Sequence, residues 1–467
     1  MTENVDSRSR DPRGTGHGRG FDRRGGESIF AIAREDRLVA YSTFVFVAMC
    51  YIFGGGPGSG GIGFAPILLA GAALLFSVTI SDGWANFQRL PLLSRLAVAI
   101  PCSIPLIQLV PLPPSLLQTM PVQALRHQAM AAAGLENAWT PLSVDPIATL
   151  YIAIVTILMF GLFVAVIGLQ RKSLWALLSL LAVLILVSTV VGIAQFLVRS
   201  PLLKFHAVSH DAALIGFFAN KNHMALILAC SVPLGYELLA RNLKRPGSIN
   251  MTMALLWMAI VAMLIATNSR AGLALGLLSS MVVALRIWPS RRVLVVGAAV
   301  GVIMLAIGLA SISTTVAAMW ERIGDAAEDG RWLLFQRSLP LIWQGWPFGA
   351  GMGSFVEVFN SQERLEWVTP LYVNNAHNDY IELLIETGVL GITAFVVFWT
   401  AIVRAVARSI SEGSGFGPAR TGDTAVVFGL LVILLFSAHS FVDYPLRRLA
   451  ALVLFVIATA CVFRERR

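Results

Sequence analysis

The chain has 467 residues, of which 57% are hydrophobic and only 13% are charged, and its formal net charge is +9. Soluble domains carry about 25% charged residues, so this composition excludes an ordinary soluble protein. The apolar residues form runs of about 20, the length that a helix needs to cross a bilayer, and the ten-residue alternation of a transmembrane β-barrel is absent. The sequence therefore predicts an all-α, polytopic membrane protein.

Residues 1–37 form an Arg-, Gly- and Asp-rich segment without a long apolar core. A cleavable signal peptide has a short charged region followed directly by an apolar one. We therefore expect residues 1–37 to be a disordered cytoplasmic tail, whose arginines act as a positive-inside topology signal.

Twelve membrane-spanning helices are expected within residues 38–463, with both termini in the cytoplasm and residues 464–467 as the cytoplasmic end. Every cytoplasmic turn then carries lysine or arginine, as the positive-inside rule requires. The expected spans are 38–53, 62–80, 92–110, 147–169, 173–198, 222–240, 249–268, 271–287, 293–312, 379–403, 424–442 and 446–463.

Long outer loops separate some of these spans, at residues 111–146, 199–221 and 313–378. Loops of this length are usually functional or disordered. The large loop 313–378, between spans 9 and 10, contains bulky residues at helical spacing within 331–343. We therefore expect it to hold a short helix that lies at the membrane surface or packs over the bundle, and that Pro340 kinks or shortens.

The span interiors are nearly free of the ionisable residues that mark ion or proton pathways. Polar residues gather instead in the outer turns, so we expect the site at the outer membrane interface. The polar clusters read GFFANKNH at 216–223, TNSRAG at 267–272, GRWLLFQR at 330–337 with PFGAGMGS at 347–354, NNAHNDYIELLIETGVLG at 374–391, and HSFVDYPLRR at 439–448.

Three arginines in these clusters are candidates for anion binding. Arg270 lies on a short outer turn, and Arg331 begins the loop helix. A guanidinium binds phosphate oxygens through two hydrogen bonds, although a lone interfacial arginine often only anchors to headgroups. The helix dipole disfavours a cation at a helix N-terminus, so Arg331 is better explained with an anionic ligand. Arg337 lies about 240° further around the helix and points away from Arg331.

His377 lies just before a span at the outer interface, beside Asn378 and Asp379. Histidine is the usual general base near neutral pH, and a neighbouring Asp or Asn can orient it. A structural role is the competing interpretation, in which Asp379 caps the following helix and Glu382 completes a capping box. Glu382 and Glu386 share a helix face, where they line a polar cavity or face outer-loop arginines.

These clusters resemble the O-antigen ligase and O-antigen polymerase superfamily of bacterial envelope proteins. The resemblance runs from PLSVDP at 141–146 to HSFVDYPLR at 439–447, and HNDYIELLIETGVLG and PFGAGMGSF are its most specific parts. It implies about twelve helices in the bacterial inner membrane and an active site that faces the periplasm. It also implies a glycosyltransferase that takes glycan from a polyprenyl-diphosphate carrier and needs no metal, nucleotide sugar or other cofactor.

The resemblance further implies that His377, Arg270 and Arg331 are catalytic. The arginines would bind the diphosphate and offset its charge as it leaves. His377 would remove the proton of the acceptor hydroxyl, and a single displacement would invert the donor carbon. The residues that we assign to substrate binding are Lys221, Asn222, Arg337, Asn378, Asp379 and Arg447.

The acceptor is not decided by these motifs, because a ligase uses lipid A–core and a polymerase uses a lipid-linked repeat unit; we lean to a polymerase of surface or secreted polysaccharide. Expected partners are the lipid-linked donor, the acceptor glycan, the bilayer and polysaccharide assembly proteins, without nucleic acid. Two other classes stay open, a transporter or flippase of lipid-linked oligosaccharide and a scaffold of an assembly complex. The individual roles of Lys221, Arg337, Glu382 and Asp443 also stay open.

Overall fold

The computed structural model describes residues 32–33, 36–56, 64–200, 203–206, 209–210, 213–243, 246–288, 291, 329–368, 373–411 and 424–464. Helices dominate these residues, as the composition predicts, and one short ribbon pairs β1 (Pro111–Leu112) antiparallel with β2 (Thr140–Pro141). The α-helices are α1 (Arg37–Phe53), α2 (Phe64–Thr79), α3 (Gly83–Arg89), α4 (Leu92–Gln108), α5 (Pro114–Leu117), α6 (Ala124–Ala132), α7 (Pro146–Gly168), α8 (Arg171–Val198), α9 (Lys221–Asn242), α10 (Pro246–Ala266), α11 (Arg270–Ile287), α14 (Asp329–Ser338), α15 (Phe355–Gln362), α16 (Asp379–Thr387), α17 (Val389–Ser411), α18 (Thr424–His439) and α19 (Leu449–Phe463), with short 3₁₀ turns that include η5 (Leu339–Trp343) and η7 (Pro445–Arg447).

Six of the described helices are long and apolar enough to cross a membrane, namely α7, α8, α9, α10, α11 and α17. A seventh span results if α2 and α3, which meet at a 72° bend, are counted together. Shorter apolar helices lie at α1, α4, α18 and α19, where further spans are expected. The chain is therefore a multi-pass membrane protein. The expected span 293–312 and most of the two terminal segments lie outside the described residues.

The span expected at 379–403 is divided in the structure. Gly388, with a φ of 53°, separates α16 from α17, and a Cβ at this position would lie only 2.1 Å from the carbonyl oxygen of Pro347. Glycine tolerates both the positive φ and the close approach. The membrane-length helix is α17 alone, so the boundary expected at residue 379 was wrong, because apolar periodicity does not reveal a backbone break.

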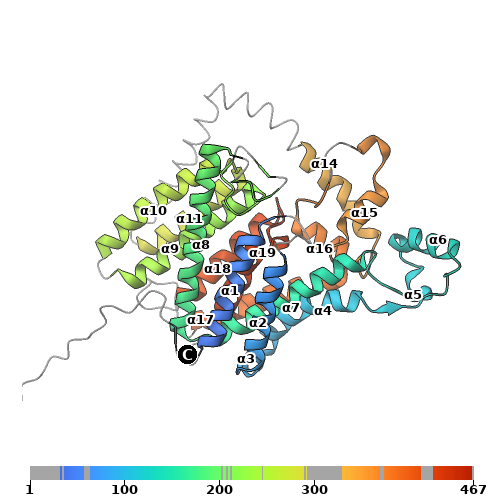
Figure 1. Cartoon of the computed structure of the whole chain (residues 1–467), viewed down its shortest axis with the longest axis horizontal. Helices are drawn as coiled ribbons and strands as arrows, with labels where there is room; N and C mark the ends of the chain where they lie inside the picture. Colours follow the sequence, from blue (N-terminus) through green and yellow to red (C-terminus); the bar gives the residue numbers. More distant parts are fainter. Residues whose placement is uncertain are drawn as a thin grey trace, which may run out of the picture.

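The helical body is held by one large apolar core that runs through α1, α2, α7, α8, α9, α18 and α19. Around it, α9 packs on α11 and α10, and α4 packs on α17. Figure 1 shows α14, α15, α5 and α6 together at one end of the molecule, away from α10. A second, smaller core lies under these outer elements and joins η5, α15 and α16 through Leu341, Phe355, Phe359 and Ile385.

The outer loop holds the expected helix, which begins at Asp329 as α14 and continues from Leu339 as the 3₁₀ turn η5. Pro340 lies inside η5. Because proline lacks the N–H of an α-helical hydrogen bond, the predicted shortening at Pro340 is confirmed.

The glycine-rich segment 347–354 docks the outer loop onto the helical body. The Ala350 carbonyl accepts a hydrogen bond from the Val144 N–H at 2.8 Å, and the Met352 N–H donates to Gln108 Oε1 at 2.9 Å. Gln108 Nε2 in turn donates to the Glu386 carbonyl at 2.8 Å. At Gly349, with φ 81°, a Cβ would lie 2.2 Å from that same carbonyl. These contacts hold the C-terminal end of α16, the helix that follows His377.

Candidate active site

The buried carboxylate of Asp443 is the centre of a polar cluster. Asp443 lies in the turn between α18 and η7, and none of its surface is exposed. Asn222 Nδ2 donates to Asp443 Oδ2 at 2.7 Å, Asn220 Nδ2 donates to the same oxygen at 3.3 Å, and the Tyr444 backbone N–H donates to Oδ1 at 3.0 Å. A buried charge is stable only when it is paired or hydrogen-bonded, and the start of α9 and this turn together supply the hydrogen bonds.

Two histidine rings face the same carboxylate. His377 Nδ1 lies 3.6 Å from Asp443 Oδ1, and His223 Nε2 lies 3.7 Å from it. Burial alone would raise the Asp443 pKa, but the interactions with both imidazoles outweigh burial and hold that pKa well below its ordinary value. Asp443 is therefore a carboxylate at neutral pH. The Tyr444 ring packs edge-on against both imidazoles, with ring centroids 5.0 and 5.2 Å away.

His377 is held in an unusual backbone conformation. Its φ is 51°, in the left-handed region that non-glycine residues rarely enter. Such strain persists where the surroundings over-determine it, and it concentrates at functional sites. The His377 side chain is 27% exposed, whereas Asp443 is fully buried. The ring therefore bridges a buried carboxylate and the accessible surface, as an oriented general base must.

Two of the predicted cations begin helices whose N-terminal ends are joined by a hydrogen bond. Lys221 is the first residue of α9, capped by Asn220, and Arg270 is the first residue of α11, capped by Ser269. Ser269 Oγ also donates to Asn222 Oδ1 at 2.8 Å. This bond links the tip of the α10–α11 hairpin to the start of α9, and Asn222 continues the connection to Asp443.

Arg331 lies in the first turn of α14 and is exposed. Its charge acts on Lys221, on His210 and on the buried His439, and the charge of Arg270 also acts on Lys221. These electrostatic interactions, with the Ser269–Asn222–Asp443 hydrogen bonds, thus connect three predicted cations from three segments to the Asp443 cluster. Helix N-termini and guanidinium groups both attract anions, so this arrangement suits a polyanionic ligand.

Arg447 does not share this arrangement, because carboxylates surround it. Its two terminal nitrogens bind Glu386 at 3.0 and 2.8 Å, and its Nε lies 2.7 Å from Glu382 and 3.7 Å from Asp379. Ser440 Oγ donates to Asp379 Oδ2 at 2.8 Å. Glu382 and Glu386, on one face of α16, thus face an arginine. This was one of the two interpretations of these residues; the other was that they line a polar cavity.

The cap of α16 is Asn378, which accepts hydrogen bonds from the N–H groups of Tyr380 and Ile381 at 3.0 and 3.1 Å. The expected Asp379 cap and capping box were wrong. Asp379 is drawn instead to Arg447 and Ser440, and Glu382 accepts from the Ala376 N–H at 2.6 Å. The side chain of Asn378 also donates to the Phe441 carbonyl at 3.0 Å, so it joins α16 to the end of α18.

Replacing Arg447 by methionine is expected to destabilise the protein by about 3–5 kcal/mol, because buried carboxylates lose their counter-charge. Burial, opposed by Arg447, raises the pKa of Asp379 to about 6 and that of Glu382 to about 7. Each carboxyl contributes most to the stability of the fold below its ordinary pKa of about 4. That contribution is lost as the pH rises through the raised pKa values of about 6 and 7. Unfolding in mixed micelles should therefore reveal a larger penalty at pH 8 than at pH 5. An equal penalty at both pH values, or one no larger than that of the exposed Arg404→Met, would contradict the charge cluster.

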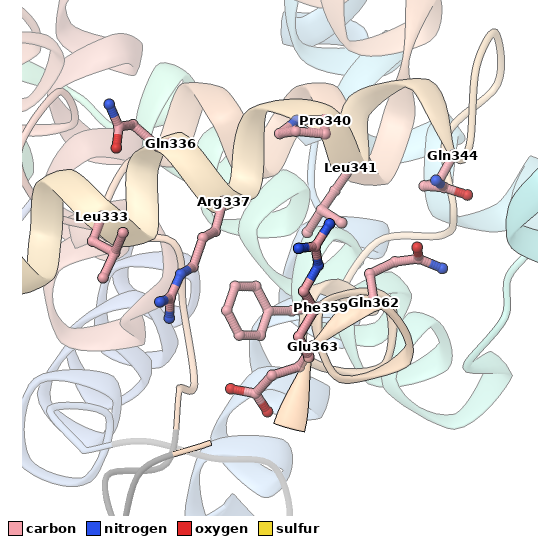
Figure 2. A pocket seen from close by; sticks show the side chains of 10 residues that line it. Leu333, Gln336, Arg337, Pro340, Leu341, Gln344, Phe359, Gln362 and Glu363 are labelled. Atoms are coloured by element: carbon pink, nitrogen blue, oxygen red, sulfur yellow. The ribbon is translucent and has the colours of Figure 1, made fainter. Parts of the chain in front are cut away.

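Arg337 is a second predicted site residue, after Arg447, that the structure places in surroundings of its own. It lines a cavity of about 440 Å³ between the α14–η5 segment and α15, with Leu333, Gln336 and Phe359 also in its wall (Figure 2). Arg331 is not part of that wall. This agrees with the opposite helix faces expected from the six-residue spacing.

Sequence reasoning left the role of Asp443 open and did not assign His223, His439 or Asn220. Both GFFANKNH and HSFVDYPLRR stood out as polar clusters beside apolar spans, and this was the available signal. Nothing in the sequence relates residues 220–223 to residues 439–443, because their proximity results from α9 packing on α18.

The chain matches the family model described as O-antigen ligase over residues 253–396. No curated protein matches the chain. The matched stretch carries Arg270, Arg331 and His377, whereas Lys221 and Asp443 lie outside it. This match, together with the membrane-length helices, supports the resemblance to the superfamily of O-antigen ligases and O-antigen polymerases and a general role of that type in a membrane.

Proposed function

We propose that this protein transfers glycan from a polyprenyl-diphosphate carrier to an acceptor hydroxyl on the periplasmic face of the bacterial inner membrane. The observation that carries the proposal is the His377 ring, held against the buried Asp443 carboxylate beside Lys221, Arg270 and Arg331. A base and a set of phosphate-binding cations are the two parts that displacement of a diphosphate requires.

In the proposed reaction, His377 Nε2 takes the proton of the acceptor hydroxyl, because Nδ1 faces Asp443. The acceptor oxygen forms a bond to the anomeric carbon of the donor as the bond from that carbon to the diphosphate oxygen breaks. The leaving diphosphate keeps the electron pair, and the cations offset its growing charge. The carboxylate of Asp443 stabilises the imidazolium that forms. A single displacement of this kind inverts the configuration of the donor carbon.

The other predicted site residues divide into two roles in this proposal. Asn222 holds Asp443, and Asn378 caps α16, so both position the base without touching substrate. Arg447 and Asp379 satisfy each other's charges and hold α16 against η7, which argues against phosphate binding by Arg447. We therefore propose Lys221, Arg270 and Arg331 as the diphosphate-binding residues.

For the topology, we propose twelve spans with both termini in the cytoplasm, in which the shorter apolar helices α1, α4, α18 and α19 also cross. Lys221, Arg270 and His377 then lie at outer ends of spans or in outer loops. The buried ion pair of Glu237 with Arg286, at 2.5 Å, lies near the opposite ends of α9 and α11. The two charges of this pair neutralise each other, and the pair lies away from Lys221 and Arg270. This favours a transferase over a transporter with a charged central path.

The size of the lipid-linked glycans tests this function in cells. The gene is deleted, and either the wild-type copy or the His377→Ala copy is supplied. For a polymerase, single repeat units should accumulate on the carrier in the deletion and in the His377→Ala strain. For a ligase, full-length chains should accumulate there. The wild-type copy should restore the normal profile in either case.

A profile that His377→Ala leaves normal would remove the support for the proposed chemistry. Glycans that are trapped on the cytoplasmic leaflet in the deletion strain would point to a flippase. A deletion phenotype that all substitutions of the charged residues rescue would point to a scaffold.

A further inference from the structure

The cavity beneath α14 has the size and the wall chemistry of a small-molecule site. Its volume of about 440 Å³ falls within the range of roughly 300–1,000 Å³ that ligand pockets occupy. Figure 2 shows Leu341 and Arg337 pointing from the upper helical segment toward Phe359. Leu341 and Phe359 are 4% and 3% exposed and belong to the small outer core, so the cavity has a packed apolar floor.

Hydrogen-bonding side chains surround this floor. The amides of Gln336, Gln344 and Gln362 line the cavity together with the guanidinium of Arg337. An amide offers both donors and an acceptor, which is the complement of a hydroxyl group. A sugar ring has hydroxyl groups around its edge and an apolar C–H face, and an apolar floor with a polar rim matches both features.

The net charge of the wall limits the class of sugar. Arg337 and Arg364 carry positive charges, and Glu363 carries the one negative charge among the lining residues. This balance suits a neutral sugar or one with an acidic group, and it disfavours an aminosugar with a free ammonium group.

The cavity is also close to the proposed transfer site along the chain. Arg331 and Arg337 are six residues apart on one helix, about 9 Å along its axis, and they lie on different faces. We propose that the cavity is a glycan subsite that holds a sugar residue remote from the transferred bond, in the glycan of either the donor or the acceptor. This inference rests on the proposed function, because it takes the substrate to be a glycan.

Kinetics with the purified full-length enzyme test the subsite. Gln362 and Gln336 lie on the exposed rim, so Gln336→Ala/Gln362→Ala should fold normally. Losing one hydrogen bond typically weakens binding about twofold to tenfold, so the double variant should raise one KM by about tenfold with kcat nearly unchanged. A rise with varied donor assigns the subsite to the donor glycan, and a rise with varied acceptor assigns it to the acceptor. The matched control is Gln118→Ala, an exposed glutamine outside the cavity, which should change neither KM.

Direct binding separates the subsite from the transfer reaction. The probe is the glycan released by mild acid from the host's own lipid-linked pool, titrated calorimetrically into the wild type, the double variant and Gln362→Trp, whose indole fills the cavity. Weaker binding by both variants supports the subsite even if the wild type transfers no glycan, an outcome that would overturn only the proposed function. Unchanged binding and unchanged KM values in a wild type that does transfer glycan would overturn the subsite and leave the transferase proposal intact.

Discussion

Replacing His377 by alanine is expected to lower kcat for glycan transfer by about 10²–10⁴-fold, because the acceptor hydroxyl loses its base. The measurement is the initial rate with purified enzyme, lipid-linked donor and acceptor in mixed micelles. The control is His127→Ala, since His127 is a partly exposed histidine on α6, away from the Asp443 cluster. Its rate should stay within about twofold of the wild type. A His377→Ala enzyme that retains more than a tenth of the rate would exclude His377 as the base.

The double variant with Asp443→Asn tests whether Asp443 acts through His377. Asp443 touches His377 Nδ1, so its loss should lower kcat when the imidazole is present and have little further effect when it is absent. Residues that act as one unit are strongly non-additive in this way. If the two losses multiply in the double variant, Asp443 supports only the fold, and thermal unfolding of each variant provides the independent check.

Replacing Arg331 by alanine is expected to cost about 10²–10³-fold in kcat, the loss found when one donor to a developing negative charge is removed. Most of the loss should fall on kcat, because the charge on the diphosphate grows as the bond breaks. Arg331→Lys keeps the charge but not the paired donors, so it should recover part of the rate. The control is Arg408→Ala, an exposed arginine in the last turn of α17.

Two results would argue against a diphosphate clamp at Arg331. If Arg331→Ala raises the KM for donor and leaves kcat intact, the residue contributes only uniform binding. If inorganic pyrophosphate inhibits the wild type and the Arg331→Ala enzyme equally, the guanidinium does not contact the leaving group. Arg270→Ala measured in parallel should behave as Arg331→Ala does, because both charges act on Lys221.

The sequence by itself determined the class of protein and supplied most of the candidate site residues. Apolar runs of membrane length are a local property, so expected spans such as 147–169 and 173–198 fall on the membrane-length helices α7 and α8. The span expected at 379–403 is instead divided at Gly388, and the span at 293–312 lies outside the described residues. Pro340 ended the loop helix as predicted, because a missing N–H acts on its own turn. The motifs around Arg270, Arg331 and His377 identified the superfamily without any knowledge of their arrangement in space.

Only the tertiary structure decided how these residues divide into roles. The sequence places Arg331, Arg337 and Arg447 all among the expected catalytic or substrate-binding residues. In the fold, the charge of Arg331 acts on Lys221 and His439, Arg337 lines a cavity, and Arg447 binds the carboxylates of α16. Asp443 becomes the centre of the site only because α9 and α18 pack together and bring residues about 220 positions apart within hydrogen-bonding distance. Hydropathy and motifs describe each segment separately, whereas charge pairing depends on distances that long-range packing sets.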